Sequence, residues 1–166
     1  MKSFRIELVT VGQEATVYSI RFKGEKYTET QKFFLKHREQ YLRELQEIQT
    51  VIENIANRRG AHEHYTVKIK EGRRTDAVVA LPNFKSRLRL YCLRMSQQTI
   101  ILFNGGFKSD NTRAYQDDPE LDRIVEELQE VNKLIDERLR PPFWEIYYQG
   151  NNLAGELEFN FDEDEE

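Results

Sequence analysis

The sequence predicts an α+β fold in which an antiparallel β-meander sheet packs against helices, with a β-hairpin added near each terminus. Short segments of alternating apolar and polar residues are typical of strands with one buried face. Two longer segments repeat apolar residues at helical spacing, from Phe34 to Ile55 and from Leu121 to Leu139. The unbroken apolar run Thr99–Phe103 indicates a central strand buried on both faces. Together these patterns favour helices packed on one face of the sheet.

The first element is expected to be a β-hairpin. Phe4, Ile6 and Leu8 alternate with polar residues. The segments 11–14 and 18–22 supply a turn and a second alternating strand, with Tyr18, Ile20 and Phe22 on its apolar face.

Helical structure is predicted to begin at Thr28, where Gln31 completes a capping box. Gly60 is a suitable stop. The polar stretch 36–40 either joins two helices or is the exposed turn of one long helix. A single helix over 29–57 would be about 43 Å long, which is long for a small domain, so a break is favoured. His37, in the polar stretch, is expected at the surface.

Residues 64–104 predict the β-meander. Turn signals occur at Glu71-Gly72-Arg73-Arg74, at Pro82-Asn83 and at Ser96-Gln97-Gln98. They separate expected strands at 65–69, 76–81, 87–95 and 99–103.

The last elements are a helix and a second hairpin. Asp118 is placed to cap the helix, Pro119 suits its first position, and Pro141-Pro142 ends it. Beyond it, residues 144–148 and 157–161 alternate on either side of Gly150-Asn151-Asn152 and predict the C-terminal hairpin.

At 166 residues, the chain is expected to form one domain over 1–161, with an acidic tail at 162–166. Its single cysteine, Cys92, excludes an internal disulfide and is expected to be a small core residue. The sequence contains neither a signal-peptide pattern nor an apolar run of about 20 residues. A cytoplasmic protein without membrane association, metal or cofactor is therefore expected.

Charge is strongly segregated along the chain. The net charge is −4, yet the segment Arg58–Arg113 contains twelve Lys and Arg against four acids, a net +8. A basic segment inside an acidic protein favours a localised site for an anion, in particular a phosphate backbone. The alternative is a solvated basic surface with no ligand.

One strand of this basic segment can carry chemistry. Alternation puts Arg87, Arg89 and Tyr91 on one face and Cys92 on the other. Because burying two guanidiniums is costly, this face is expected to be open and to grip phosphates. The following Asn104-Gly105-Gly106-Phe107-Lys108 can add a lysine and exposed backbone N–H groups, although paired glycines more often mark a turn or bulge.

Two histidines are further candidates. His62 and His64 share a strand face, but no neighbouring cysteine or carboxylate cluster completes a metal site. A general base or a phosphate contact beside Arg58 and Arg59 is the alternative role.

The run RLRLYCLRMSQQTIILFNGGFKS (87–109), followed by the helix DDPELDRIVEELQEVNKLI (117–135), resembles RelE/HigB-type toxins of bacterial toxin–antitoxin pairs, within the RelE/ParE-like superfamily. The resemblance covers roughly residues 60–139. It implies a RelE-like sheet with helices and metal-independent endoribonuclease activity on mRNA, which can be ribosome-bound. In such cleavage the 2′-hydroxyl attacks the neighbouring phosphate. The resemblance also implies a cognate antitoxin as partner.

By position, Arg89 matches the strand arginine of this family, and Lys108 matches its lysine after the next strand. Tyr91 or His64 would then move protons. Additional residues are expected to bind the RNA, namely Arg58, Arg59, Arg73, Arg74, Lys85, Arg87 and Asn104. The alternative is a RelE-like adaptor that binds nucleic acid or protein without catalysis, which the acidic tail favours.

Overall fold

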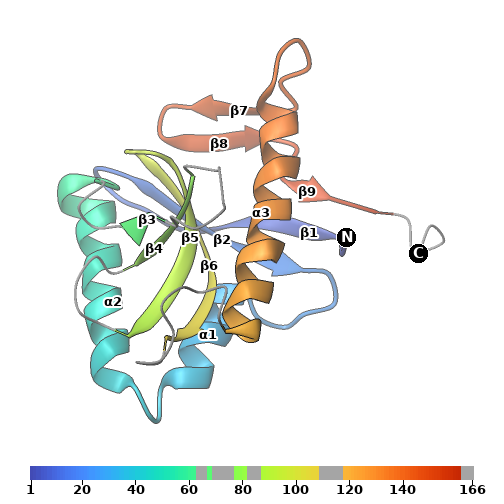
Figure 1. Ribbon diagram of the computed structural model, residues 1–166. Helices are drawn as coiled ribbons and strands as arrows, with labels where there is room; N and C mark the ends of the chain where they lie inside the picture. The colour runs from blue at the N-terminus through green and yellow to red at the C-terminus, as the bar shows by residue number, and fades with distance from the viewer. Residues whose placement is uncertain (63–66, 69–76, 82–86, 109–117, 162–166) are drawn as a thin grey trace.

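The computed structural model describes residues 1–62, 67–68, 77–81, 87–108 and 118–161. A seven-stranded sheet with the order β3-β4-β5-β6-β2-β1-β9 forms the middle layer (Figure 1). Helices α1 and α2 cover one face, while α3 and the two-stranded β7–β8 sheet cover the other. The α+β class is therefore confirmed, but the expectation that all helices pack on one face is wrong.

The N-terminal hairpin is confirmed. It consists of β1 (Phe4–Val11) and β2 (Thr16–Phe22), which pair antiparallel. A β-bulge interrupts the register between Leu8 and Thr10. Gly12 lies in the turn, where a Cβ would be 2.0 Å from the carbonyl oxygen of Ala56. Only glycine allows the turn to pack this closely on the helical segment.

The helical region is broken, as the polar stretch favoured. Helix α1 spans Glu29–His37, α2 spans Leu42–Asn54, and the π-helical turn η1 covers Ile55–Arg59. The Thr28–Gln31 capping box is present, and Gly60 ends η1 with a φ of 75°. The surface prediction for His37 is wrong. This residue is 7% exposed because its ring packs between those of Phe33 and Tyr41, with centroid distances of 5.1 and 5.8 Å.

The meander consists of β3 (Val67–Lys68), β4 (Val78–Leu81), β5 (Leu88–Ser96) and β6 (Thr99–Phe107), each antiparallel to the next. However, β6 pairs parallel with β2, so the sheet is mixed and not antiparallel throughout. The chain leaves β2 through the helices and enters the meander at the far edge. After four alternating strands, β6 returns beside β2 in the same direction.

Helix α3 spans Pro119–Leu139, and Asp118 accepts hydrogen bonds from Glu120 and Leu121 N–H. The second hairpin pairs β7 (Ile146–Gln149) with β8 (Asn152–Gly155). The expectation that residues 157–161 form its second strand is wrong. Instead, β9 (Glu158–Phe159) pairs with Phe4 and Arg5 of β1. Stacking of Phe4 on Phe159, at a centroid distance of 4.4 Å, favours this pairing.

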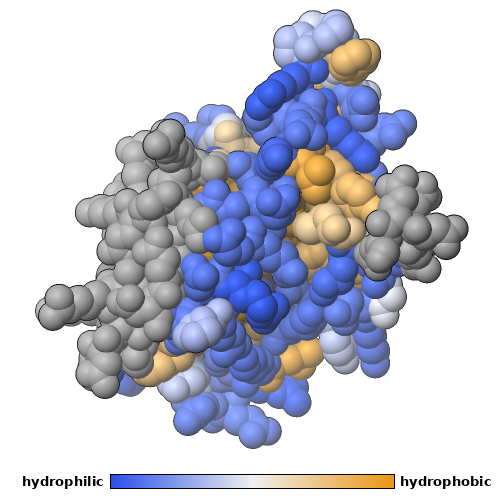
Figure 2. All heavy atoms as spheres, turned by 45° about the vertical axis from the view of Figure 1, so that its right-hand side comes forward, coloured by the Kyte–Doolittle hydropathy of each residue, from blue (hydrophilic) through white to orange (hydrophobic). Residues whose placement is uncertain are grey.

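Each face of the sheet has its own core. Tyr91, Leu93, Ile101 and Phe103 point toward α3, whereas Leu90, Cys92, Ile100 and Leu102 point toward α1 and α2. This confirms Thr99–Phe103 as a central strand and Cys92 as a core residue. Figure 2 shows the outer side of α3 as a hydrophilic band beside a hydrophobic surface patch. In the described part of the chain, no helix is both long and apolar enough to cross a membrane.

Candidate nucleic-acid interface

The β5–β6 register brings together three of the cationic residues singled out in the sequence. Arg89 lies opposite Gly106, and the Lys108 N–H donates to the Arg87 carbonyl at 2.7 Å, so Lys108 lies opposite Arg87. Directly opposed residues share a sheet face, as do residues two apart on one strand. Arg87, Arg89 and Lys108 therefore belong to the same face of the sheet. They lie at the open end of the β5–β6 hairpin, where β5 starts and β6 ends, and are here called the cation face.

Two glycines allow this end of the hairpin to pack tightly. A Cβ on Gly105 would be 1.8 Å from the Arg89 carbonyl oxygen, and one on Gly106 would be 3.0 Å from Leu121 Cδ2 of α3. The Gly105 N–H donates to Asn104 Oδ1 at 2.7 Å. The glycine pair thus serves close strand and helix packing, and the Gly105 N–H already has an acceptor within the protein.

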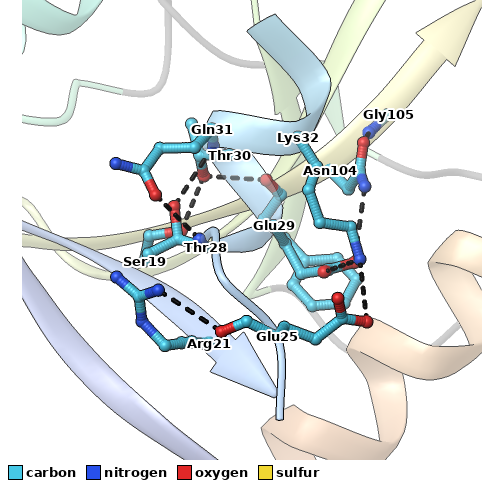
Figure 3. Close-up of polar contacts among 11 residues, drawn as sticks. Ser19, Arg21, Glu25, Thr28, Glu29, Thr30, Gln31, Lys32, Asn104 and Gly105 are labelled. Carbon is cyan, nitrogen blue, oxygen red and sulfur yellow. Dashed lines mark hydrogen bonds and ion pairs between the residues drawn. The ribbon is translucent and has the colours of Figure 1, made fainter. Parts of the chain in front are cut away.

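A polar network anchors α1 to β2 and β6 (Figure 3). The Thr30 hydroxyl lies 2.7 Å from that of Ser19 and donates to the Phe103 carbonyl at 2.8 Å. The buried Glu29 carboxylate accepts from Asn104 Nδ2 at 3.3 Å and lies 2.6 Å from Lys32 Nζ. Because Asn104 is committed to Glu29 and Gly105, the structure places its side chain in a structural network, and it does not join the three cations.

The expectation of an open face is wrong at Tyr91. Its side chain is 2% exposed and belongs to the core under α3, because the helix covers this part of β5. Exposure increases toward the start of the strand: Arg89 is partly buried and Arg87 is exposed. Burial lowers the pKa of Arg89, while the electrostatic effect of the Tyr91 phenolate raises this pKa. The guanidinium nevertheless remains cationic at neutral pH.

The remaining candidates do not join this site in the described structure. Arg58 and Arg59 are exposed on η1. This turn contacts the start of β2 through the Ala56 carbonyl, which accepts from the N–H groups of Glu14 and Ala15. Because β2 starts opposite Thr99, η1 lies near the opposite end of β6 from Lys108. His64, Arg73, Arg74 and Lys85 lie outside the described residues.

The structure also contains a groove that the sequence did not predict. It has a volume of about 920 Å³ and lies between β1, α1 and α2. Its lining combines hydroxyl, amide and aliphatic groups, including Thr10, Thr30, Thr50 and Ile52. Threonines and glutamines scattered over three distant elements give no sequence pattern, so only the folded chain reveals this groove.

Other chemistry finds little support among the described residues. No group of three or more His, Cys, Asp or Glu side chains is placed to hold a metal ion there. Burial raises the pKa of the Cys92 thiol, which disfavours the nucleophilic thiolate. The candidate His62 lies next to the β5–β6 turn, where its Nε2 is 2.8 Å from Gln97 Nε2. This turn is at the opposite end of β5 and β6 from the cation face.

Comparison with known proteins identified no relative: no family model matches the chain, and no curated protein or solved structure shows significant similarity to it.

Proposed function

We propose that this protein binds RNA, and that the cation face grips the phosphate backbone. The observation that carries the proposal is the β5–β6 register, which assigns Arg87, Arg89 and Lys108 to one face at the end of one hairpin. Arginines two residues apart on a strand are about 7 Å apart, which suits neighbouring phosphates. Their planar donor groups match phosphate oxygens.

The environment of these residues supports binding to a fixed position on the backbone. Close packing at Gly105 and Gly106 holds the end of β6 against β5 and α3. Partial burial of Arg89 lowers the local dielectric constant around its charge, and this strengthens its attraction to an anion. Under this proposal, the protein is a relative of the RelE/HigB-type toxins that binds nucleic acid.

A second candidate function is metal-independent RNA cleavage by a toxin of this kind. The partial burial of Arg89 favours it, because a preorganised, desolvated guanidinium stabilises the charge that develops on a phosphate during 2′-hydroxyl attack. Lys108 would hold the scissile phosphate. His64 would then be the candidate for proton transfer, since Tyr91 is buried. An antitoxin partner belongs to this second candidate.

The binding proposal is tested with a fluorescent single-stranded RNA and anisotropy titrations between 50 and 200 mM salt. With three phosphate contacts, log Kd should change with log salt with a slope of about 2, since each contact contributes roughly 0.7. Alanine at Arg87, Arg89 or Lys108 should each weaken binding and reduce the slope by about 0.7. Arg43→Ala, an exposed position on α2, is the matched control. Binding by the three variants that equals wild type would refute the proposal.

Cleavage is scored with the same RNA in EDTA. The second candidate predicts products ending in a cyclic phosphate, no cutting at a 2′-deoxy position, and a rate about 10²-fold lower in Arg89→Ala. RNA that is bound and stays intact would eliminate cleavage and leave the binding proposal standing.

A further inference from the structure

Among the described residues, part of strand β1 has a neighbouring strand on one side only. β9 pairs only with Phe4 and Arg5, and the Ile6 N–H donates to the Leu157 carbonyl at 2.9 Å. Beyond this point, the segment Leu8–Val11 has β2 on one side and no strand of the described residues on the other. We call Leu8–Val11 the open edge.

The open edge lacks most of the features that keep sheet edges from pairing. Natural edges are commonly protected by charges, by proline or by covering elements. Here Leu8, Val9 and Val11 are 54%, 51% and 59% exposed, and no charged residue or proline occurs between them. The one protective feature is the β-bulge between Leu8 and Thr10. Exposed aliphatic groups beside unpaired backbone groups are typical of a site for strand addition.

The groove described above lies alongside the open edge, because Leu8, Val9 and Thr10 form part of its wall. Near the β1–β2 turn, the chain packs tightly on η1 where Gly12 meets Ala56. Elsewhere the groove is bordered by Thr28 and Gln31 at the start of α1 and by Thr50 and Glu53 of α2. An added strand would therefore have a cavity beneath it for alternate side chains.

The charged groups of the groove indicate what it accepts. Glu7, Glu53 and Arg58 are its charged lining residues. Glu7 is already ion-paired with Arg21, with an O–N distance of 2.7 Å. The formal charges of the remaining Glu53 and Arg58 cancel, and the other lining residues are uncharged, with hydroxyl, amide and aliphatic groups and the ring of Phe34. This lining complements uncharged side chains.

We propose that the open edge binds an uncharged, extended segment of a partner protein, which adds a strand beside Leu8–Val11 and places aliphatic or hydroxyl side chains in the groove. The unpaired N–H and C=O groups of the edge require an extended backbone as ligand. This site is separate from the cation face and does not depend on RNA binding.

A second copy of the chain is a less suitable occupant. The open edge is four residues long, about 13 Å, and pairing two such edges buries far less than the roughly 1,200 Å² of a stable interface. The bulge also disrupts the regular register that symmetric pairing of two edges requires. A segment that enters the groove gains contact area that edge-to-edge pairing does not supply.

The test uses a random heptapeptide phage library selected on the wild-type protein, followed by synthesis of the best peptide and titration by calorimetry. Alternation from Ile6, whose N–H points away from β2, makes the Leu8 N–H point outward as well. Leu8→Pro therefore removes an edge donor, Val9→Lys adds a protecting charge, and Thr50→Lys obstructs the groove from α2. Each should weaken binding at least about 10-fold. Leu42→Lys, at a residue 55% exposed elsewhere on α2, should not.

Hydrogen exchange of the wild type should show new amide protection at Leu8 and Val11 when the peptide binds. Thr50→Lys leaves the strand intact, so its result stands even if the Leu8 variant folds poorly. The proposal is overturned if no peptide is selected, if binding is insensitive to Val9→Lys and Thr50→Lys, or if wild type sediments as a dimer that Val9→Lys dissociates. Alanine variants of the cation face should bind the peptide normally, which separates this test from that of RNA binding.

Discussion

The cation face and the open edge differ in how firmly the rest of the molecule holds them. At the end of β6, Phe107 stacks on Tyr41 of the α1–α2 joint at a centroid distance of 5.0 Å, and Gly106 meets Leu121 of α3 on the other face. The cation face is thus supported from both layers. Among the described residues, the open edge has β2 as its one neighbouring strand, and its aliphatic side chains are about half exposed.

This difference matches the ligands that the two regions are proposed to bind. Small, hard anions are bound best by charges that need no rearrangement, because ordering long cationic side chains reduces the net gain. An added strand brings its own regular hydrogen bonds, so the receiving edge has only to remain unpaired. Four predictions probe this contrast, from the largest effect to the smallest.

Tyr91 should contribute to the α3 core, and its hydroxyl should have no role in chemistry. Tyr91→Ala removes a side chain that is 2% exposed, and this should lower the free energy of unfolding by about 4 kcal/mol in urea titrations. Tyr91→Phe keeps the ring and should be much milder. RNA binding and any cleavage should survive in the phenylalanine variant. Loss of cleavage in a well-folded Tyr91→Phe protein would restore a proton-transfer role for the tyrosine.

Gly105 and Gly106 should respond differently to one added methyl group. In Gly105→Ala the Cβ meets a backbone oxygen of Arg89 at 1.8 Å, so β5 and β6 must separate. We expect a loss of about 3 kcal/mol of stability together with weaker RNA binding. Gly106→Ala meets only the end of the Leu121 side chain at 3.0 Å, which can move, so about 1 kcal/mol or less is expected. Equal unfolding midpoints for the two variants would show that the hairpin end is not tightly packed.

His37 should make the support under the cation face sensitive to pH. Burial lowers its pKa, as does the charge of Lys36, while Glu120 raises it. A histidine with a lowered folded pKa is favoured neutral in the fold, so stability falls as pH drops below the unfolded value of about 6.5. His37→Phe keeps a ring between Phe33 and Tyr41 and should remove this part of the pH dependence. Unfolding curves at pH 7 and pH 5 measure the change in the free energy of unfolding for both proteins. Subtracting one change from the other removes the contribution of the other histidines.

Local chemistry explains what could be predicted from the sequence. The capping box at Thr28, the break after His37 and the apolar environment of Cys92 depend on neighbouring residues, and all three are confirmed. The shared face of Arg87 and Arg89 follows from strand alternation alone. The position of Lys108 across from Arg87 depends on the hairpin register.

Tertiary pairing explains what could not be predicted. Alternation puts Tyr91 with the arginines but does not reveal that α3 covers it. The residues next to His37 in the sequence are polar and give no sign that its ring packs between those of Phe33 and Tyr41. The open edge exists because β2 pairs with β6 and because β9 is only two residues long, and neither fact has a local signal.

The smallest effect is expected where the paired half of β1 meets the open edge. The Glu7 carboxylate receives two hydrogen bonds from Arg21, at 2.7 and 2.8 Å, and Arg21 lowers its pKa. An acid with a lowered folded pKa stabilises the fold above its unfolded pKa and loses that contribution as pH falls through the folded value. Because the pair is partly exposed, Glu7→Gln should cost less than about 1 kcal/mol at pH 7 and nothing at pH 2.

Arg5→Gln is the matched control, since Arg5 makes a more exposed contact with Glu7 at 3.1 Å. If Glu7→Gln also changes peptide binding at the open edge, the two halves of β1 are coupled. The ion pair would then position the edge as well as stabilise the hairpin. If peptide binding is unchanged, Leu8–Val11 acts as a docking segment independent of the ion pair, with β2 as its one neighbouring strand among the described residues.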